Sequence, residues 1–520
     1  MYRRHTTVLL VSISVVSFIG SSTNAQTSPP EFATSQPAAS EEGPTTSGPA
    51  DSHDSPTASP SVPKAGPKYL LLRYNEDFSY LDGEPDTYNS DIFDPIKNIH
   101  LDDDWRLRLG GEIRFRMESE TNRNFGARDP TNDTFLLYRE LLHADFHYRN
   151  TFRIFVEGID ARVADRNLPQ IPGMENTFDV HQAFADIRLL GEQTPLTLRI
   201  GRQEMIYGKE RVIGKLDWMN EGRRFDGAKL MYASPKFDID FFWVKPVFFM
   251  NKPFSNPWNT HINEGMNHKI DHWREEQNFY GIYSSYKGIN DQVIDLYFLG
   301  FNDRGFFTNA NGRYGDLNVY TIGSRFAGTA GNFDYDIEGG GQWGKWDGDE
   351  VHAWMFGSDA GYTFKNVSTT PRIGVGFDFA TGDDTPRDGS HDTWNQLYPT
   401  GHAFLGYMDD VARANIISPN VNFSFKPVKD VTAKLTWYHF WLDSNLDALY
   451  NAGGVPIRRN VTGSSGNDVG DELDATVTWQ IDVHSALLVG WSHFWPSNFV
   501  NSSGFSRDSD YVYLQYQFRF

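Results

Sequence analysis

The sequence predicts an all-β protein, a transmembrane antiparallel β-barrel of about 18 strands (roughly 16–18). Three observations predict this fold: a polar average composition, abundant aromatic residues, and alternation of apolar and polar residues. Hydrophobic residues make up 39% of the chain and the mean hydropathy is -0.51, yet 15% of the residues are aromatic. A membrane barrel has this composition because only alternate residues meet lipid, while aromatic girdles mark both interfaces.

The alternation is clearest in the last ten residues, "YVYLQYQFRF". Side chains in a strand alternate between two faces, so one face collects Val512, Leu514, Tyr516, Phe518 and Phe520. The stretch 105–118 repeats the pattern, with four arginines and two glutamates on its polar face. An arginine that faces lipid at the midplane costs roughly 2–4 kcal/mol, so this face is expected to line a wet lumen. The last strand then pairs with the first to close the barrel.

Further alternating segments follow, each bounded by Gly, Pro, Asn or Asp. If a strand and its connection take about 25 residues, the roughly 454 residues after the linker hold about 18 strands. We expect short turns at the end that holds both termini and longer loops at the other. A soluble β-sandwich is the alternative, since its polar faces would meet bulk water.

The N-terminal region predicts export. "YRRH" is basic, "TTVLLVSISVVSFIG" is apolar, and "TNA" offers small residues before Gln26, which together predict a signal peptide over residues 1–25. The apolar run is shorter than the ~20 residues of a membrane-spanning helix. Residues 26–66 are rich in Pro, Ser, Thr and Ala and predict a disordered linker. The barrel domain is expected over 67–520, in the outer membrane of a Gram-negative-type cell. The chain has no cysteine, which excludes disulfides and thiolate metal sites.

Several patches resemble the alginate export outer-membrane proteins: "LGGEIRFRMESE", "LRIGRQEMIYGKERVIGKLDWMNEGRRFDGAKL", "WYHFWLDSNLD", "DVGDELDATVTWQ", "WSHFWP" and "YQFRF". The resemblance extends over most of the chain after the linker and depends on the order and number of the patches. It implies an eighteen-stranded barrel whose lumen narrows to an arginine-lined constriction, with loops that can occlude it. It also implies passive passage of alginate or a related anionic polysaccharide or oligosaccharide.

The resemblance implies a set of pore-lining residues: Arg139 in "YRELLHADF", Arg199 and Arg202 in "RIGRQE", Arg224 and Asp226 in "RRFDG", and Arg413 in "VARANI". The alternation in "GEIRFRME" adds Arg114 and Arg116. Arg202 is ambiguous, because strict alternation places it on the lipid face with Ile200 unless a bulge occurs near Gly201.

Arginine suits a uronate cargo because its planar fork donates two hydrogen bonds to one carboxylate, and rings of such residues select anions. The alternative role of each arginine is a salt bridge to a neighbouring strand. The net charge of -21 does not decide the selectivity, because salt screens exposed charges over about 8 Å. An acidic lumen with a cationic cargo is the opposite possibility, and its candidates are Asp145, Asp336, Glu338 and Asp378.

A conduit needs no catalytic residue, and no Gly-x-Ser-x-Gly elbow occurs. A secreted polysaccharide lyase is an alternative, with Tyr and His of "WYHFW" and "WSHF" in a cleft. A porin for small anions, neutral sugars or aromatic acids is another. No cofactor or metal is predicted, although the acidic loops "HLDDDW", "KWDGDE" and "TGDDTPRDGSHD" have carboxylates that calcium could use. The expected partners are the polysaccharide, outer-membrane lipid and periplasmic export proteins, whereas the acidic composition argues against nucleic acid.

Overall fold

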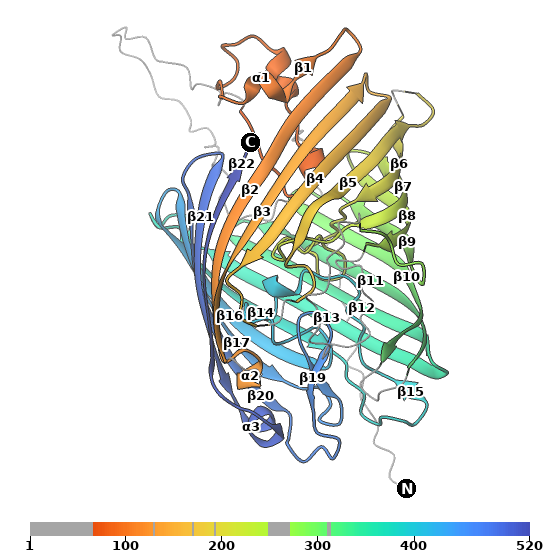
Figure 1. Cartoon of the computed structure of the whole chain (residues 1–520), viewed down its shortest axis with the longest axis vertical. Helices are drawn as coiled ribbons and strands as arrows, with labels where there is room; N and C mark the ends of the chain where they lie inside the picture. The colour runs from red at the N-terminus through yellow and green to blue at the C-terminus, as the bar shows by residue number, and fades with distance from the viewer. Residues whose placement is uncertain (1–65, 128–130, 169–170, 192–193, 248–270, 309–313) are drawn as a thin grey trace, which may run out of the picture. The chain divides into compact units, whose positions relative to one another are not determined.

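The described part of the chain folds as a closed antiparallel β-barrel (Figure 1). The computed structural model describes residues 66–127, 131–168, 171–191, 194–247, 271–308 and 314–520. Within these residues the sheet has 20 strands, of which β1 and β15 are two residues long and the other 18 (20 − 2) form the wall. The predicted fold and strand number are confirmed. The predicted signal peptide, and the linker except for its last residue, lie outside the described residues.

Each wall strand pairs with the next along the chain, and β22 pairs with β2. The wall strands are β2 (Trp105–Thr121), β3 (Asn132–Tyr148), β4 (Phe152–Ala164), β5 (Asn176–Arg188), β6 (Leu196–Gln203), β7 (Phe225–Ala233), β8 (Phe237–Pro246), β9 (Gln277–Tyr286), β10 (Gln292–Thr308), β11 (Tyr314–Ala330), β12 (Phe333–Trp346), β13 (Asp349–Thr363), β14 (Arg372–Ala380), β16 (Ile416–Val428), β17 (Val431–Trp441), β20 (Asp468–Gln480), β21 (Ser485–Pro496) and β22 (Ser509–Arg519). The short elements are η1 (Arg73–Asn75), η2 (Ser79–Asp82), α1 (Asp94–Lys97), β1 (Ile99–His100), α2 (Arg123–Gly126), β15 (Ser390–His391), η3 (Gly401–Ala403), β18 (Ala448–Tyr450), β19 (Pro456–Arg459) and α3 (Asn498–Ser503). None of the helices in the described residues has the length and apolar character needed to cross a membrane.

The two ends of the barrel differ, as predicted. Short turns such as 331–332 and 429–430 lie at the end that also holds Trp105 and the C-terminal Phe520. We call this the turn end; it is uppermost in Figure 1. Longer connections such as 204–224 and 381–415 start from the opposite, loop end. In bacterial outer-membrane barrels the short turns face the periplasm, so we expect the loop end to face outward.

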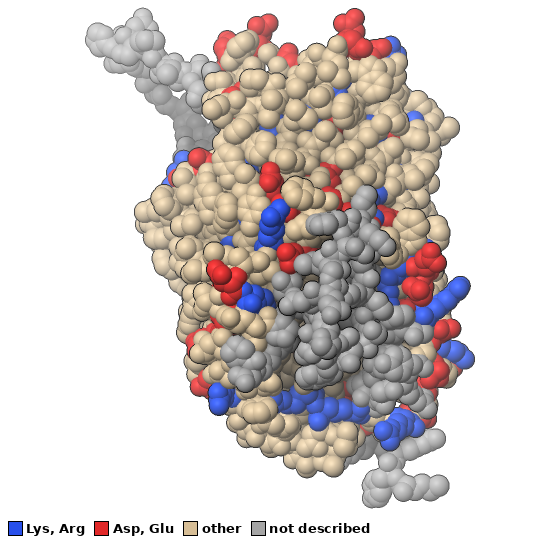
Figure 2. Space-filling view, in the orientation of Figure 1, with Lys and Arg blue, Asp and Glu red and all other residues tan. Residues whose placement is uncertain are grey.

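The closing strand behaves as its sequence predicts. In β22, Val512 and Leu514 are exposed on the outer face while Tyr511 and Tyr513 are buried on the inner face. The same alternation on β13 exposes Trp354 and Phe356 and buries Val351 and Ala353. In Figure 2 the upper wall presents mostly uncharged atoms, and acidic residues stand along the turn-end rim. An apolar band therefore surrounds the wall, as lipid requires.

The inner face is less uniformly polar than the sequence predicts. Near the loop end, strands β7 to β13 bury apolar side chains inside the barrel, among them Phe225, Phe242, Val244, Phe279, Leu299, Phe301, Leu317, Val319 and Val351. Loop residues such as Val212, Ile213 and Leu405 belong to the same cluster. These inner faces are apolar because folded-back loops, and not water, cover them.

An arginine on the outer face of the closing strand should destabilise the barrel. Leu514 is 40% exposed on β22, and we expect Leu514→Arg to lower the free energy of unfolding by about 2–4 kcal/mol, because the charge would enter lipid. Val461→Arg is the control, since Val461 lies on a loop and is 73% exposed. Guanidinium unfolding of protein refolded into lipid vesicles, followed by tryptophan fluorescence, measures both. Equal effects of the two variants would contradict an outward-facing Leu514.

Candidate permeation pathway

Four of the predicted arginines lie on the inner wall. Arg114 and Arg116 come from β2, Arg139 from β3 and Arg199 from β6, and each is at most 3% exposed. Each points inward because its neighbours in sequence, such as Phe115, face lipid. The wall positions the arginines by simple alternation.

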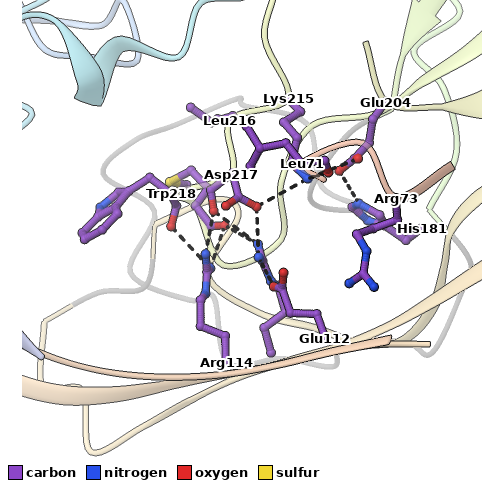
Figure 3. Close-up of polar contacts among 12 residues, drawn as sticks. Leu71, Arg73, Glu112, Arg114, His181, Glu204, Lys215, Leu216, Asp217 and Trp218 are labelled. Atoms are coloured by element: carbon purple, nitrogen blue, oxygen red, sulfur yellow. Dashed lines mark hydrogen bonds and ion pairs between the residues drawn. The ribbon is translucent and has the colours of Figure 1, made fainter. Parts of the chain in front are cut away.

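The loop 204–224, which we call the crossing loop, contacts three of these arginines, and Figure 3 shows its contacts with Arg114. Arg114 donates from Nη1 to the carbonyl of Asp217 at 2.7 Å and from Nη2 to the carbonyl of Met219 at 3.1 Å. Arg116 donates to the carbonyl of Trp218 at 2.9 Å. Arg139 donates to Asp217 Oδ1 at 2.9 Å and also bonds Glu112. Backbone carbonyls of the loop thus occupy the guanidinium donors.

The crossing loop is also fixed to the other side of the barrel. Arg211 bonds the carboxylate of Asp336 and lies 3.4 Å from Glu338, both on β12. Asp336 also accepts from Arg325 of β11 at 2.6 Å. Figure 1 shows β2 across the front of the barrel and β12 across the back. The loop therefore spans the lumen between two charged anchors.

A second connection, the capping loop 381–415, pairs with the crossing loop. Tyr398 N–H donates to the carbonyl of Val212 at 3.0 Å, and Gly214 N–H donates to the carbonyl of Tyr398 at 2.8 Å. The predicted Arg413 belongs to this loop. It donates to Asp378 of β14 at 2.5 Å and to the carbonyl of Arg211 at 3.3 Å. Arg413 thus ties both loops to the wall.

A column of stacked side chains joins the loops at a second place. The guanidinium of Arg116 lies 3.8 Å from the ring centre of Trp218. His402 stacks on the other side of Trp218 at 4.0 Å, and Tyr407 follows at 4.7 Å from His402. Arg116 and Trp218 belong to the wall and the crossing loop, whereas His402 and Tyr407 belong to the capping loop.

The segment before β2 enters the barrel at its turn end. Tyr74 packs on Phe184 and donates to the carbonyl of Glu204 at 3.0 Å. The predicted Arg199 lies 3.8 Å over the ring of Phe184 and forms two bonds to Asp186, at 2.7 and 2.8 Å. Arg199 therefore supports this segment through a cross-strand salt bridge.

The structure corrects the placement of Arg202 and Asp226. Neither pairing of β6 shows a register shift, so Arg202 shares the outward phase of Ile200. Arg202 donates to the carboxylate of Asp226 at 2.8 and 3.0 Å. A bulge does occur, but on β5, where Glu157 pairs with Gln182 and Gly158 with Val180. The bulge turns His181 inward and does not turn Arg202.

Arg224 lies just before β7 and is fully buried. It donates to Glu221 at 2.7 Å and to Asp271 at 2.6 Å. These contacts join the crossing loop to the residues that precede β9. Arg224 is thus enclosed by carboxylates in a loop junction, away from the Arg114 cluster.

The acidic candidates face inward as the alternation predicts, and each is paired. Asp145 accepts from Arg153 at 2.7 Å, Asp336 and Glu338 contact Arg211, and Asp378 accepts from Arg413. Within the described residues, Arg114 differs from the other predicted arginines, because it donates only to backbone carbonyls and to the amide oxygen of Asn220. Its positive charge is not neutralised by a bonded carboxylate.

Sequence reasoning missed Arg211, Lys215 and Trp218. Lys215 bridges the crossing loop and the first segment, donating to the carbonyl of Leu71 at 2.8 Å and lying 3.3 Å from Glu204. The available signal was the length of "EMIYGKERVIGKLDWMNEGRR", which is too long and too mixed in composition for a hairpin turn. Alternation does not predict where the side chains of such residues point, because they lie in a loop and not in a strand.

The metal and lyase alternatives can be compared with the described residues. No group of three or more His, Asp or Glu in the described parts of the chain is placed to hold a metal ion. His439 and His493, the histidines of the lyase alternative, lie on the outward phase of β17 and β21 beside exposed tryptophans. They therefore do not face the interior where the loops and arginines meet.

The alginate export family model matches residues 105–514, which include almost the whole wall. The chain belongs to the alginate export family. Solved structures from Pseudomonas aeruginosa share its fold. OpdO has a TM-score of 0.52 at 12% identity, covering 80% of this chain and 97% of that chain. The outer membrane protein OprD has 0.51 at 10%, covering 80% and 93%, and OccD3 (OpdP) has 0.51 at 10%, covering 85% and 97%. No curated protein matches the chain in sequence.

This alginate export family member is thus a porin-like barrel of the outer membrane. Of the predicted pore-lining arginines, Arg114, Arg116 and Arg139 donate to the crossing loop.

The contact between the two loops should depend on pH through Glu210. This side chain is buried and accepts from Thr400 Oγ1 at 2.5 Å and from Lys215 N–H at 3.0 Å. Burial raises the pKa of Glu210 from 4.5 to about 7, against the Lys215 ammonium. Since the pKa in the folded protein lies above the ordinary value, the docked loops are most stable below about pH 4.5 and lose that stabilisation as the pH rises to 7.

Hydrogen exchange at the Gly214 and Tyr398 amides, corrected for intrinsic rates, measures this dependence. We expect protection to fall between pH 4.5 and 7 in the wild type, and Glu210→Gln to remove that fall. Glu350→Gln is the control, because the Glu350 side chain is 55% exposed at the rim. A fall of unchanged size in Glu210→Gln would exclude Glu210 as its origin.

Proposed function

We propose that this barrel is a passive outer-membrane channel for an anionic polysaccharide or oligosaccharide of the alginate type. The observation that carries the proposal is the cluster of Arg114, Arg116 and Arg139 around the carbonyls of residues 217–219. The family assignment supports the same cargo class.

The cluster has the chemistry to exchange partners. A carboxylate oxygen is a stronger acceptor than a backbone carbonyl, because a charge-assisted hydrogen bond is roughly twice as strong as a neutral one. A uronate that reaches Arg114 would therefore compete with the carbonyls of Asp217 and Met219. The cargo would replace the crossing loop on the guanidinium, and the loop would return after the cargo leaves. Weak, exchangeable binding of this kind is what conduction requires.

A porin for small anions, neutral sugars or aromatic acids is the second candidate. It is favoured by the packing of the crossing and capping loops against the apolar inner face, where Val212 and Ile213 are at most 5% exposed. A polymer requires both loops to leave the lumen, whereas a small solute requires a smaller displacement. The two candidates therefore differ in the loop movement that they need.

Removing the unneutralised charge should reduce anion selectivity. We expect Arg114→Ala to lower the anion-to-cation permeability ratio about tenfold, because a unit charge roughly 6 Å from a hydrated ion attracts an anion by about 0.7 kcal/mol in water and repels a cation by the same amount. Reversal potentials in planar bilayers measure the ratio. Arg162→Ala is the matched control, since Arg162 is half exposed on the outward phase of β4.

Block of the current by oligouronates separates the two candidates. Under the polysaccharide proposal, block strengthens with oligomer length and weakens in Arg114→Ala. A cation-selective wild-type channel, or a block that is the same for monomers and oligomers, would refute it.

Loosening the crossing loop should increase conduction. Arg211→Ala removes the anchor to β12, and we expect openings to become more frequent because Asp336 then keeps only its wall partner Arg325. Arg372→Ala is the control: Arg372 is also an inward arginine, but it bonds Asp334 and Asp359 of the wall at 2.6 and 2.7 Å. Single-channel recording compares the two. Equal opening frequencies would show that the Arg211 anchor does not hold the channel closed.

A further inference from the structure

Two similar columns of side chains face outward at the loop end of the two strands that flank β20. On β17 the column is Trp437, His439 and Trp441, and on β21 it is Trp491, His493 and Trp495. Strand β20 runs between them, and Figure 1 shows the three strands side by side at the left of the barrel. The channel function uses neither column, because both lie on the outer surface.

Each histidine is held by an aspartate and a tryptophan. His439 Nδ1 lies 2.9 Å from Asp471 Oδ1, and its ring centre lies 3.9 Å from that of Trp441. His493 Nδ1 lies 2.7 Å from Asp510 Oδ1, and its ring centre lies 4.3 Å from that of Trp495. Two polar His–Asp pairs thus stand among tryptophans at the outer-leaflet end of the wall.

An apolar groove of about 340 Å³ continues from these pairs toward the turn end. Its floor is made by outward residues of β20, the small Ala475 followed by Val477. Leu435 of β17 and Trp491 of β21 form its sides, since Ala475 pairs with both. Trp491 connects the groove with the polar pairs, because its Nε1 donates to Asp510 at 3.3 Å.

We propose that this surface binds one glycolipid of the outer leaflet, with an acyl chain in the groove and an uncharged sugar headgroup between the tryptophan columns. The two outer strands are two strand spacings apart, roughly 9.6 Å, which leaves room for a sugar ring between the two columns. The site is independent of the channel cargo.

The charges of the polar end select the headgroup. Asp468 lies 3.4 Å from His439, and Asp508 lies 3.9 Å from His493, so two imidazoles stand among four carboxylates when Asp471 and Asp510 are included. Carboxylates repel a phosphate and accept hydrogen bonds from hydroxyl groups. A headgroup rich in hydroxyls therefore fits better than a headgroup that carries a phosphate, as both phosphatidylethanolamine and phosphatidylglycerol do.

Native mass spectrometry of the full-length protein in a polyoxyethylene detergent, which carries no sugar, tests the proposal. The probes are a diacylglycerol with one uncharged hexose, phosphatidylethanolamine and phosphatidylglycerol, all with the same acyl chains. We expect the hexose lipid to bind about tenfold more tightly than the other two. Equal affinities would show only annular lipid, and a preference for either phospholipid would overturn the sugar assignment.

Two variants test the location. Ala475→Phe fills the floor of the groove and should weaken hexose-lipid binding about tenfold, whereas Ala228→Phe, on the outward phase of β7, should not. Asp471→Asn combined with Trp491→Leu provides a second test if Ala475→Phe does not fold. Unchanged binding in a folded variant of either kind would exclude this site.

Discussion

The structure depends on one electrostatic constraint: a charge on the inner wall must be paired with an opposite charge, or hydrogen-bonded by the loop backbone, wherever the loops exclude water. Lipid forces the charged residues of the spanning strands inward, and breaking a buried ion pair by removing one partner costs about 3–5 kcal/mol. The wall meets this constraint in two ways. Arg199 and Asp186 pair between neighbouring strands, whereas Arg211 and Arg413 pair loops with the wall.

The same constraint explains how closely the loops approach the wall. Glu472 on β20 accepts a hydrogen bond from Met408 N–H at 2.9 Å, so the capping loop supplies a donor to a buried carboxylate. Gly406 has a φ of +86°, and a Cβ there would lie 2.3 Å from Glu472 Oε2. Only a glycine permits this approach without displacing the carboxylate. The loop backbone thus supplies a hydrogen-bond donor to Glu472, as guanidinium groups do for other buried acids of the wall.

Alternation predicts the wall well and the interior poorly. The period of two correctly gives the closing strand and the inward direction of Arg114 and Arg116, because a strand has only two faces. It fails for the bulge at His181, since a bulge adds one residue without changing composition. It also gives no direction for Arg211 or Trp218, because loop residues are placed by distant partners such as Asp336 and Arg116. Alternation did not predict the apolar cluster on the inner face for the same reason, because the residues that cover this cluster lie in the loops.

The selectivity of such a channel follows from which charges remain unneutralised, not from how many arginines face inward. Arg139 and Arg413 each share their charge with an acid, so an approaching anion gains little net attraction from them. Arg114 is held by carbonyl dipoles, which are lost when the crossing loop moves. Under the proposed function, displacement of the loop opens the lumen and exposes a positive charge in one step. Under the proposed function, the anion that replaces the carbonyls compensates for the contacts that the loop gives up, and this exchange couples opening to the presence of cargo.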